Sequence, residues 1–171
     1  MRRSRQAVYA LAIAGLAAAA CAVLIAILAG RDPSGVSPAS GPGTLEPDRG
    51  SGTAPSSPDD PPTSGAHRAE KVARDGAELS DDQLLEALQL GNVVLTYATA
   101  RPPAALKALQ ADASGPFDPA LADAGQAVIL SRRPGSSGVI ALAWRRRLRV
   151  AGAADPRLRA FVDAWLGQGP G

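Results

Sequence analysis

Few residues in this sequence could act on a substrate. It contains one histidine, His67, and one cysteine, Cys21. A serine or cysteine nucleophile needs a histidine and an acid beside it, but His67 lies in a segment rich in Pro, Gly and Ser, and Cys21 lies in an apolar run. The single cysteine excludes an intramolecular disulfide. The Gly-Ser-Ser-Gly stretch at 135–138 falls between two predicted strands rather than before a helix, unlike a phosphate-binding loop. We therefore expect a protein that is not an enzyme.

Arginines are concentrated near one predicted strand, Val139 to Val150. Alternation along a strand puts its aliphatic residues and Trp144 on one face, which only Arg146 interrupts. The opposite face carries three arginines, and two more end the preceding strand: Arg145, Arg147, Arg149, Arg132 and Arg133. Such a face could attract anionic lipid head groups or wall polymers. The alternative is a solvated face that nearby Asp and Glu residues balance. A net charge of +2 gives no reason to expect nucleic acid as a partner.

An apolar segment follows the basic N-terminus. Residues 7–30 carry no charge, and about 24 residues form a helix of roughly 36 Å, enough to cross a ~30 Å hydrocarbon core. Arg2, Arg3 and Arg5 precede it, which favours cytoplasmic residues 1–6 and an exported C-terminal part. Two alternatives are a cleaved signal peptide, whose apolar core is usually shorter, and a lipoprotein acylated at Cys21. We predict an uncleaved single-pass anchor in the cell membrane.

The chain after this segment has two parts. Residues 31–75 are dominated by Pro, Gly, Ser and Thr and have no hydrophobic period, so we expect a disordered linker there. Residues 76–171 contain apolar runs that can form a core. We expect one small extracytoplasmic domain from them, of a size that buries only a modest share of its surface.

Helix boundaries are marked by capping residues. Ser80 to Gln83 has the spacing of a capping box, and Gly91 is a suitable C-terminal stop for that helix. Pro103 can open a second helix. Asp155 and Pro156 form an N-cap and N1 pair that opens a last helix.

Three β-rich runs lie between these helices, at residues 92–97, 126–131 and 139–150. The Pro and Gly residues between the last two predict that they form a hairpin. The order helix, strand, helix, strand, strand, helix predicts an α+β fold, a small two-layer sandwich with a short, mainly antiparallel sheet.

Four stretches resemble one protein family. The first is similar to a PPTSGPH motif, and the second to LVHALEHG followed by a VVIWY-like strand. The third resembles an Ala-Trp strand, and the fourth a closing helix with a G-x-GP tail. They are Pro61–His67, Leu84–Gly91 with Val93–Tyr97, Ile140–Leu148 and Phe161–Pro170. Together they resemble the bacterial domain of unknown function 3105 over residues 60–171. That family is typically a membrane-anchored protein with an N-terminal helix and an exported domain.

The resemblance also implies a metal site. The family pattern has two histidines four residues apart on a helix and a third in the preceding loop, a set suited to copper or zinc. Here the loop position is His67, and the helical positions are Glu86 and Leu90. Leucine cannot bind a metal, so His67 and Glu86 are the two candidate ligands of a degenerate member. Alternatively, His67 is a loop residue retained for hydrogen bonding, and Glu86 is a solvated carboxylate.

These observations predict a membrane-anchored extracytoplasmic domain of unknown function, a non-catalytic interaction module without a cofactor. Its expected partners are the membrane and an envelope protein or an anionic polymer. The alternative is a copper- or zinc-binding protein with a reduced histidine site.

Overall fold

The structure, a computed structural model, describes residues 41–50 and 56–170. The predicted cytoplasmic N-terminus and the predicted membrane helix at 7–30 lie outside these residues. Within them, no helix has the length and apolar character needed to span a membrane.

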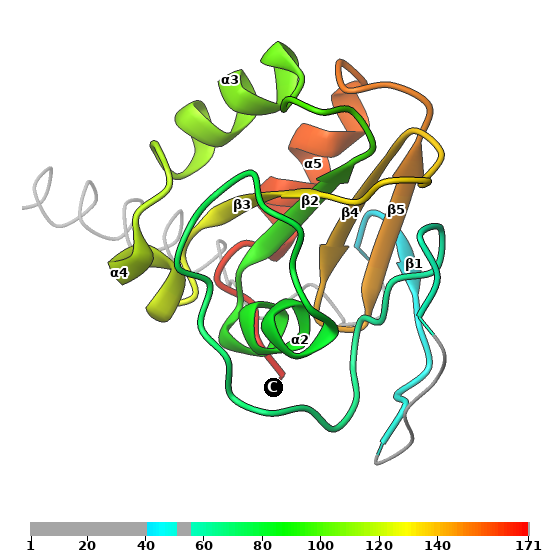
Figure 1. The fold of residues 1–171 in the computed structure, drawn as a ribbon, viewed down its shortest axis with the longest axis vertical. Coiled ribbons are helices and arrows are strands. Elements are labelled where there is room, and N and C mark those ends of the chain that lie inside the picture. Colours follow the sequence, from blue (N-terminus) through cyan, green and yellow to red (C-terminus); the bar gives the residue numbers. More distant parts are fainter. Residues whose placement is uncertain (1–40, 51–55, 171) are drawn as a thin grey trace, which may run out of the picture. The chain divides into compact units, whose positions relative to one another are not determined.

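The described chain forms a mixed five-stranded sheet with four helices (Figure 1). The sheet order is β1-β5-β4-β2-β3, with β2 and β3 parallel and the other pairs antiparallel. The elements are β1 (Thr44–Leu45), α2 (Asp81–Leu90), β2 (Val93–Tyr97), α3 (Ala104–Ala113), α4 (Pro119–Asp123), β3 (Val128–Arg132), β4 (Val139–Ala143), β5 (Arg146–Val150) and α5 (Pro156–Trp165). The predicted α+β class is confirmed.

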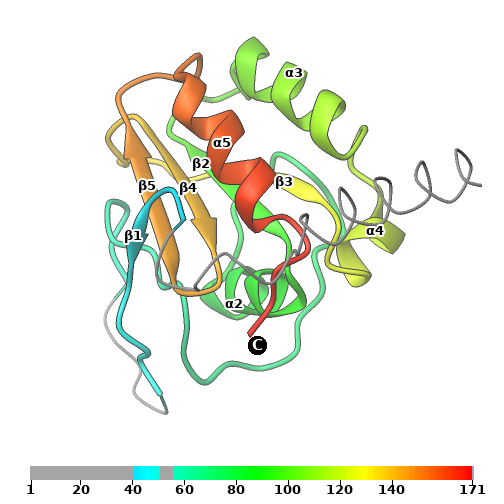
Figure 2. The ribbon, with the colours of Figure 1, turned by 180° about the vertical axis from the view of Figure 1, so that it is seen from behind.

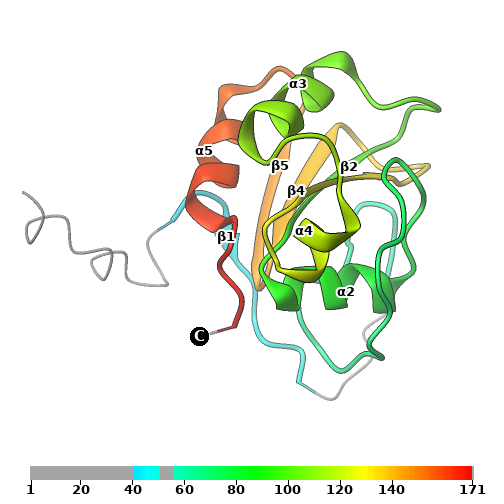
Figure 3. The ribbon, with the colours of Figure 1, turned by 90° about the vertical axis from the view of Figure 1, so that its left-hand side faces the viewer.

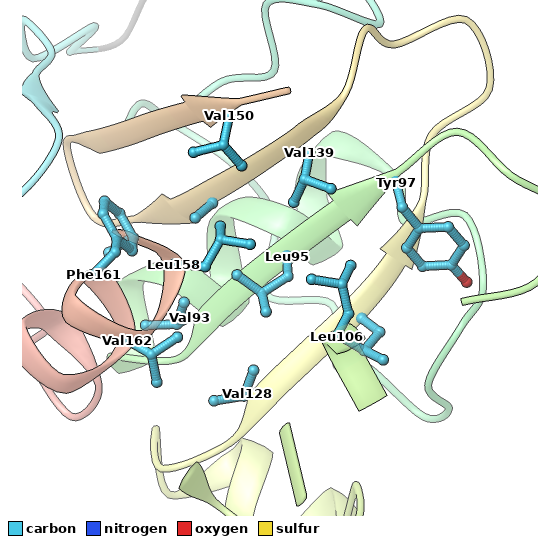
Figure 4. Close-up of a cluster of buried hydrophobic side chains, with 13 residues drawn as sticks. Val93, Leu95, Tyr97, Leu106, Val128, Val139, Val150, Leu158, Phe161 and Val162 are labelled. Carbon is cyan, nitrogen blue, oxygen red and sulfur yellow. The ribbon is translucent and has the colours of Figure 1, made fainter. Parts of the chain in front are cut away.

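The sheet is covered on both faces, as the side view in Figure 3 shows. Leu106 of α3 and Leu158, Phe161 and Val162 of α5 pack on one face (Figure 4). α2 and α4 pack on the other, where a second buried cluster lies. The expected two-layer arrangement is therefore wrong, and the layers number three. The reason is that β2 and β4 are buried along their whole length, and strands apolar on both sides need cover on both sides.

The capping residues place the helices as predicted. Gln83 N donates to Ser80 Oγ at 3.1 Å, and Ser80 N donates to Gln83 Oε1 at 3.2 Å, which completes the capping box. Gly91 ends α2 with φ of 108°, a conformation that favours glycine. Asp155 caps α5 with Pro156 in its first turn.

The predicted strand 139–150 is wrong as a single element. It divides into β4 and β5, joined by a tight turn at Trp144 and Arg145, with Ala143 opposite Arg146. Arg145 adopts φ of 56°, and the sequence signal for such a turn, a Gly, Asn or Asp, is missing here. The expected hairpin between β3 and β4 is also wrong, because β3 pairs with β2 in parallel. The long connection through α3 and α4 permits that crossover.

Much of the expected linker belongs to the folded unit. Thr44 and Leu45 pair with β5, and Thr63, Ser64 and Val72 are buried. We call residues 56–79 the belt, because they run from β5 past α2 to the outer edge of β3 (Figure 1). The linker prediction over 31–75 is therefore incorrect for residues 41–50 and 56–75. These residues contain few aliphatic side chains, and polar contacts with distant strands hold them in place. Composition does not reveal such contacts.

The belt closes the outer edge of β3 through Asp75. Leu130 N donates to Asp75 Oδ1 at 2.7 Å, and Gln110 Nε2 donates to Asp75 Oδ2 at 3.0 Å. Gly76 N then donates to the Leu130 carbonyl at 2.8 Å. An edge strand with satisfied backbone groups does not recruit another strand.

Replacing Asp75 with alanine should leave the amide of Leu130 buried without a partner. We expect Asp75→Ala to lower the free energy of unfolding by about 2 kcal/mol, measured by urea denaturation. Asp163→Ala is the control, because Asp163 forms an exposed pair with Arg159, and such pairs contribute about 0–1 kcal/mol. Equal effects of the two substitutions would contradict this role.

Candidate functional site

The conspicuous Pro61–His67 stretch forms a loop pinned to the hairpin between β4 and β5. Arg145 N donates to the Thr63 carbonyl at 2.9 Å, and Arg147 Nη2 donates to the Pro61 carbonyl at 3.0 Å. Pro61 to Ser64 are buried. This loop places His67 beside Glu86 of α2.

His67 and Glu86, the two residues predicted from the sequence as ligands, lie together. His67 Nε2 is 3.3 Å from Glu86 Oε2, and the His67 side chain is only 6% exposed. Its Nδ1 is 2.9 Å from the Gly65 carbonyl oxygen. The Trp144 ring lies beside the imidazole, with ring centroids 6.4 Å apart. The sequence predicts Trp144 only as a core residue, and nothing in the sequence indicates its place at this site.

The hydrogen bonding of His67 fixes which nitrogen carries a proton. A carbonyl oxygen can only accept, so the proton lies on Nδ1. In neutral histidine, Nε2 then presents a lone pair to the Glu86 carboxylate, which also only accepts. Two acceptors 3.3 Å apart attract each other only when a cation lies between them. That cation is either a second proton, which makes an imidazolium–carboxylate pair, or a metal ion.

The surroundings fit a metal ion in part. A backbone carbonyl that holds Nδ1–H is a common way to orient a metal-binding imidazole. Glu86 also lines a hollow of about 10 Å³ with Lys71, Leu90 and Asp123 around it, room for about one water molecule. Among residues 41–50 and 56–170, however, no three His, Cys, Asp or Glu side chains form a metal-binding group. The described chain supplies two donors.

Four of the five predicted surface arginines pair with carboxylates of the same chain. Arg149 lies 2.8 Å from Asp59, Arg132 lies 2.7 Å from Glu78, and Arg133 lies 3.8 Å from Asp81. Arg147 pairs with Asp60 and, at 3.5 Å, with Glu46. Arg145 is the exception, donating from Nε to the Glu46 carbonyl at 3.3 Å. The geometry matches the alternative in which nearby acids balance the arginines.

Contacts with these arginines help to lower the pKa of two carboxyl groups in the belt, those of Asp59 and Asp60. The backbone N–H of Ser137, followed by Arg149, holds the pKa of Asp59 below its usual value. For Asp60, burial is the largest influence and acts to raise the pKa, but Arg147 and Arg49 together outweigh it and lower the pKa. A carboxyl with a lowered pKa stabilises the fold above its unfolded-state pKa near 3.8, and this contribution is lost as pH falls through the folded-state value.

We expect Asp60→Asn to destabilise the protein at pH 7 and to destabilise it less at pH 3, which lies below the unfolded-state pKa near 3.8. The loss at pH 7 should be about 1 kcal/mol, since Asp60 is half exposed and solvent screens its pairs. Urea denaturation of both proteins at the two pH values measures it, with Asp163→Asn as the control. A difference as large at pH 3 as at pH 7 would show that the carboxylate charge is not the cause.

No curated protein and no solved structure is significantly similar to this chain. A family model described as "Protein of unknown function (DUF3105)" matches residues 52–171, which include the belt from residue 56 onward, all four helices and strands β2 to β5. The chain therefore belongs to the DUF3105 family, as the motifs predicted.

Proposed function

We propose that this protein is a membrane-anchored, non-catalytic module outside the membrane that binds a copper or zinc ion at His67 and Glu86. The observation that carries the proposal is the pair of facing acceptors, His67 Nε2 and Glu86 Oε2, at 3.3 Å. A metal ion bonded to both, at roughly 2.0–2.2 Å from each, is compatible with that separation.

Burial favours a built site over a chance contact. The His67 side chain is 6% exposed and that of Glu86 is 20% exposed, so little solvent screens the interaction between them. The Gly65 carbonyl fixes the ring, so the Nε2 lone pair keeps its direction. The belt contributes His67 and α2 contributes Glu86, so a bound ion would also fasten these two segments.

Two protein donors leave coordination positions for water or for donors from another protein. A site of that kind suits holding and transferring an ion more than a structural role, because structural zinc sites use four protein ligands. The arginines support this choice indirectly. Since carboxylates of the same chain neutralise most of them, they are a weaker candidate for the functional surface.

The sequence alone supports the proposed membrane anchor. Residues 7–30 are uncharged and apolar, and arginines precede them, a pattern that favours a cytoplasmic N-terminus and an exported domain. A site on this domain would then meet metal ions or partner proteins of the cell envelope.

Titration of the full-length, detergent-solubilised chain with Cu²⁺ or Zn²⁺ tests the proposal. We expect one ion per chain, no binding by His67→Ala, and affinity about tenfold lower for Glu86→Gln. Glu70→Gln is the matched control, since Glu70 is exposed and contacts Ser80 rather than His67. No binding above background in the unmodified chain would leave His67 and Glu86 as an ion pair and refute the proposal.

A gain of affinity provides a second test. Leu90 lies one turn after Glu86, lines the same hollow and is 40% exposed, so an imidazole there should join the site. We expect Leu90→His to raise metal affinity about tenfold or more, whereas Leu90→Gln should not. Isothermal titration of the three proteins compares them. Equal affinities would show that the metal binds elsewhere.

A further inference from the structure

Arg146 is a buried cation without a counter-ion among residues 41–50 and 56–170. The residue is 3% exposed, and within the described part of the chain its side chain forms no hydrogen bond or ion pair, with Nη2 buried and unpartnered. Burial, followed by the neighbouring Arg145, lowers the pKa of its guanidinium. Buried arginines are normally paired with an anionic group. Arg146 has no such partner among the described residues.

Its one compensating contact is aromatic. The guanidinium carbon lies 4.4 Å from the centroid of the Trp165 ring. A cation–π contact of this kind attracts the charge but satisfies none of the five N–H donors of arginine. The site therefore retains the capacity to bind a carboxylate.

Residues 41–46, which we call the strap, lie along this part of the sheet edge (Figure 2). Trp165 Nε1 donates to the Pro42 carbonyl at 2.9 Å, and a Cβ at Gly41 would collide with the Trp165 ring. The strand part of the strap is only two residues long, and both are exposed. The strap therefore fits closely against Trp165 but pairs with only two residues of the β5 edge.

The register places one strap residue beside Arg146. Leu45 is its cross-strand partner, so the two side chains lie on the same face of the sheet. Leu45 is apolar and 46% exposed, which makes it a poor match for a buried cation. The match to the family begins at residue 52, so β5 belongs to the family domain and the strap lies outside the matched region.

We propose that the edge of β5 is a strand-binding site, which the strap occupies in the same chain, and that it takes an extended acidic segment of a partner protein. The segment pairs with β5 in the register of the strap, and its carboxylate takes the place of the Leu45 side chain and binds Arg146. Addition of a strand provides affinity through the backbone, and side-chain pockets provide specificity. This site is separate from His67 and Glu86, so its tests need no metal.

The first test places the carboxylate within the chain. Leu45→Glu should stabilise the strap against Arg146, whereas Leu45→Gln, a neutral residue of the same shape, should not. We expect a higher melting temperature for Leu45→Glu than for Leu45→Gln, and no difference between the two in an Arg146→Met background. Equal melting temperatures with Arg146 present would show that the carboxylate does not reach it and would overturn the proposal.

The second test supplies the strand as a peptide. The probes are Gly-Pro-Gly-Thr-Glu-Glu-Pro and the strap sequence Gly-Pro-Gly-Thr-Leu-Glu-Pro, added to the full chain with Trp144→Phe so that Trp165 is the only indole. We expect Trp165 fluorescence to report binding of the acidic probe about tenfold tighter, with the preference lost in Arg146→Met. Equal affinities for the two probes, or no binding of either, would refute it.

Discussion

Two ion pairs attach the belt to β5: Asp59 pairs with Arg149, and Asp60 pairs with Arg147. Arg149 reaches Asp59 at 2.8 Å, and Arg147 reaches both Asp60 and the Pro61 carbonyl. The Arg149 side chain is 41% exposed and that of Arg147 is 14% exposed, but Asp60 is half exposed, so solvent screens these pairs in part and each contributes modestly. At the other end, Asp75 fastens the belt to β3. His67 lies between these two attachments, and only a belt held at both ends keeps it beside α2.

The sheet beneath the belt provides the rigid support for both proposed sites. Its central strands are buried on both faces, with α3 and α5 on one side and α2 and α4 on the other. Glu86 therefore projects from a helix whose inner face is fixed by Leu84, Leu85 and Leu88. On the opposite face, α5 is fixed by Phe161 and Val162, which positions Trp165 over Arg146. A side chain on a packed element keeps its direction, as a binding site requires.

Local signals in the sequence are sufficient for α2, α3 and α5, but insufficient for the short helix α4 and for the belt. The capping box at Ser80, the stop at Gly91 and the Asp155-Pro156 pair act within a few residues, so reading the sequence places α2 and α5 well. The partners of the belt are remote, as Asp60 and Arg147 are 87 residues apart. The turn at Arg145 has no glycine to mark it. The resemblance to the family nevertheless points to His67 and Glu86, because a motif identifies the residues of a site without its geometry.

The two proposed sites share a physical feature. Each contains polar or charged groups that are shielded from water and have no partner of the opposite kind among the described residues. At His67 and Glu86 two acceptors face each other, and at Arg146 a cation has no anion within the described residues. Many other charged side chains of the described chain are paired, as Lys71 with Asp123 and Arg132 with Glu78 illustrate. An imbalance costs more where the dielectric is low. Sites that are shielded from solvent and where pairing fails are therefore the best indication of where an external ion or chain binds.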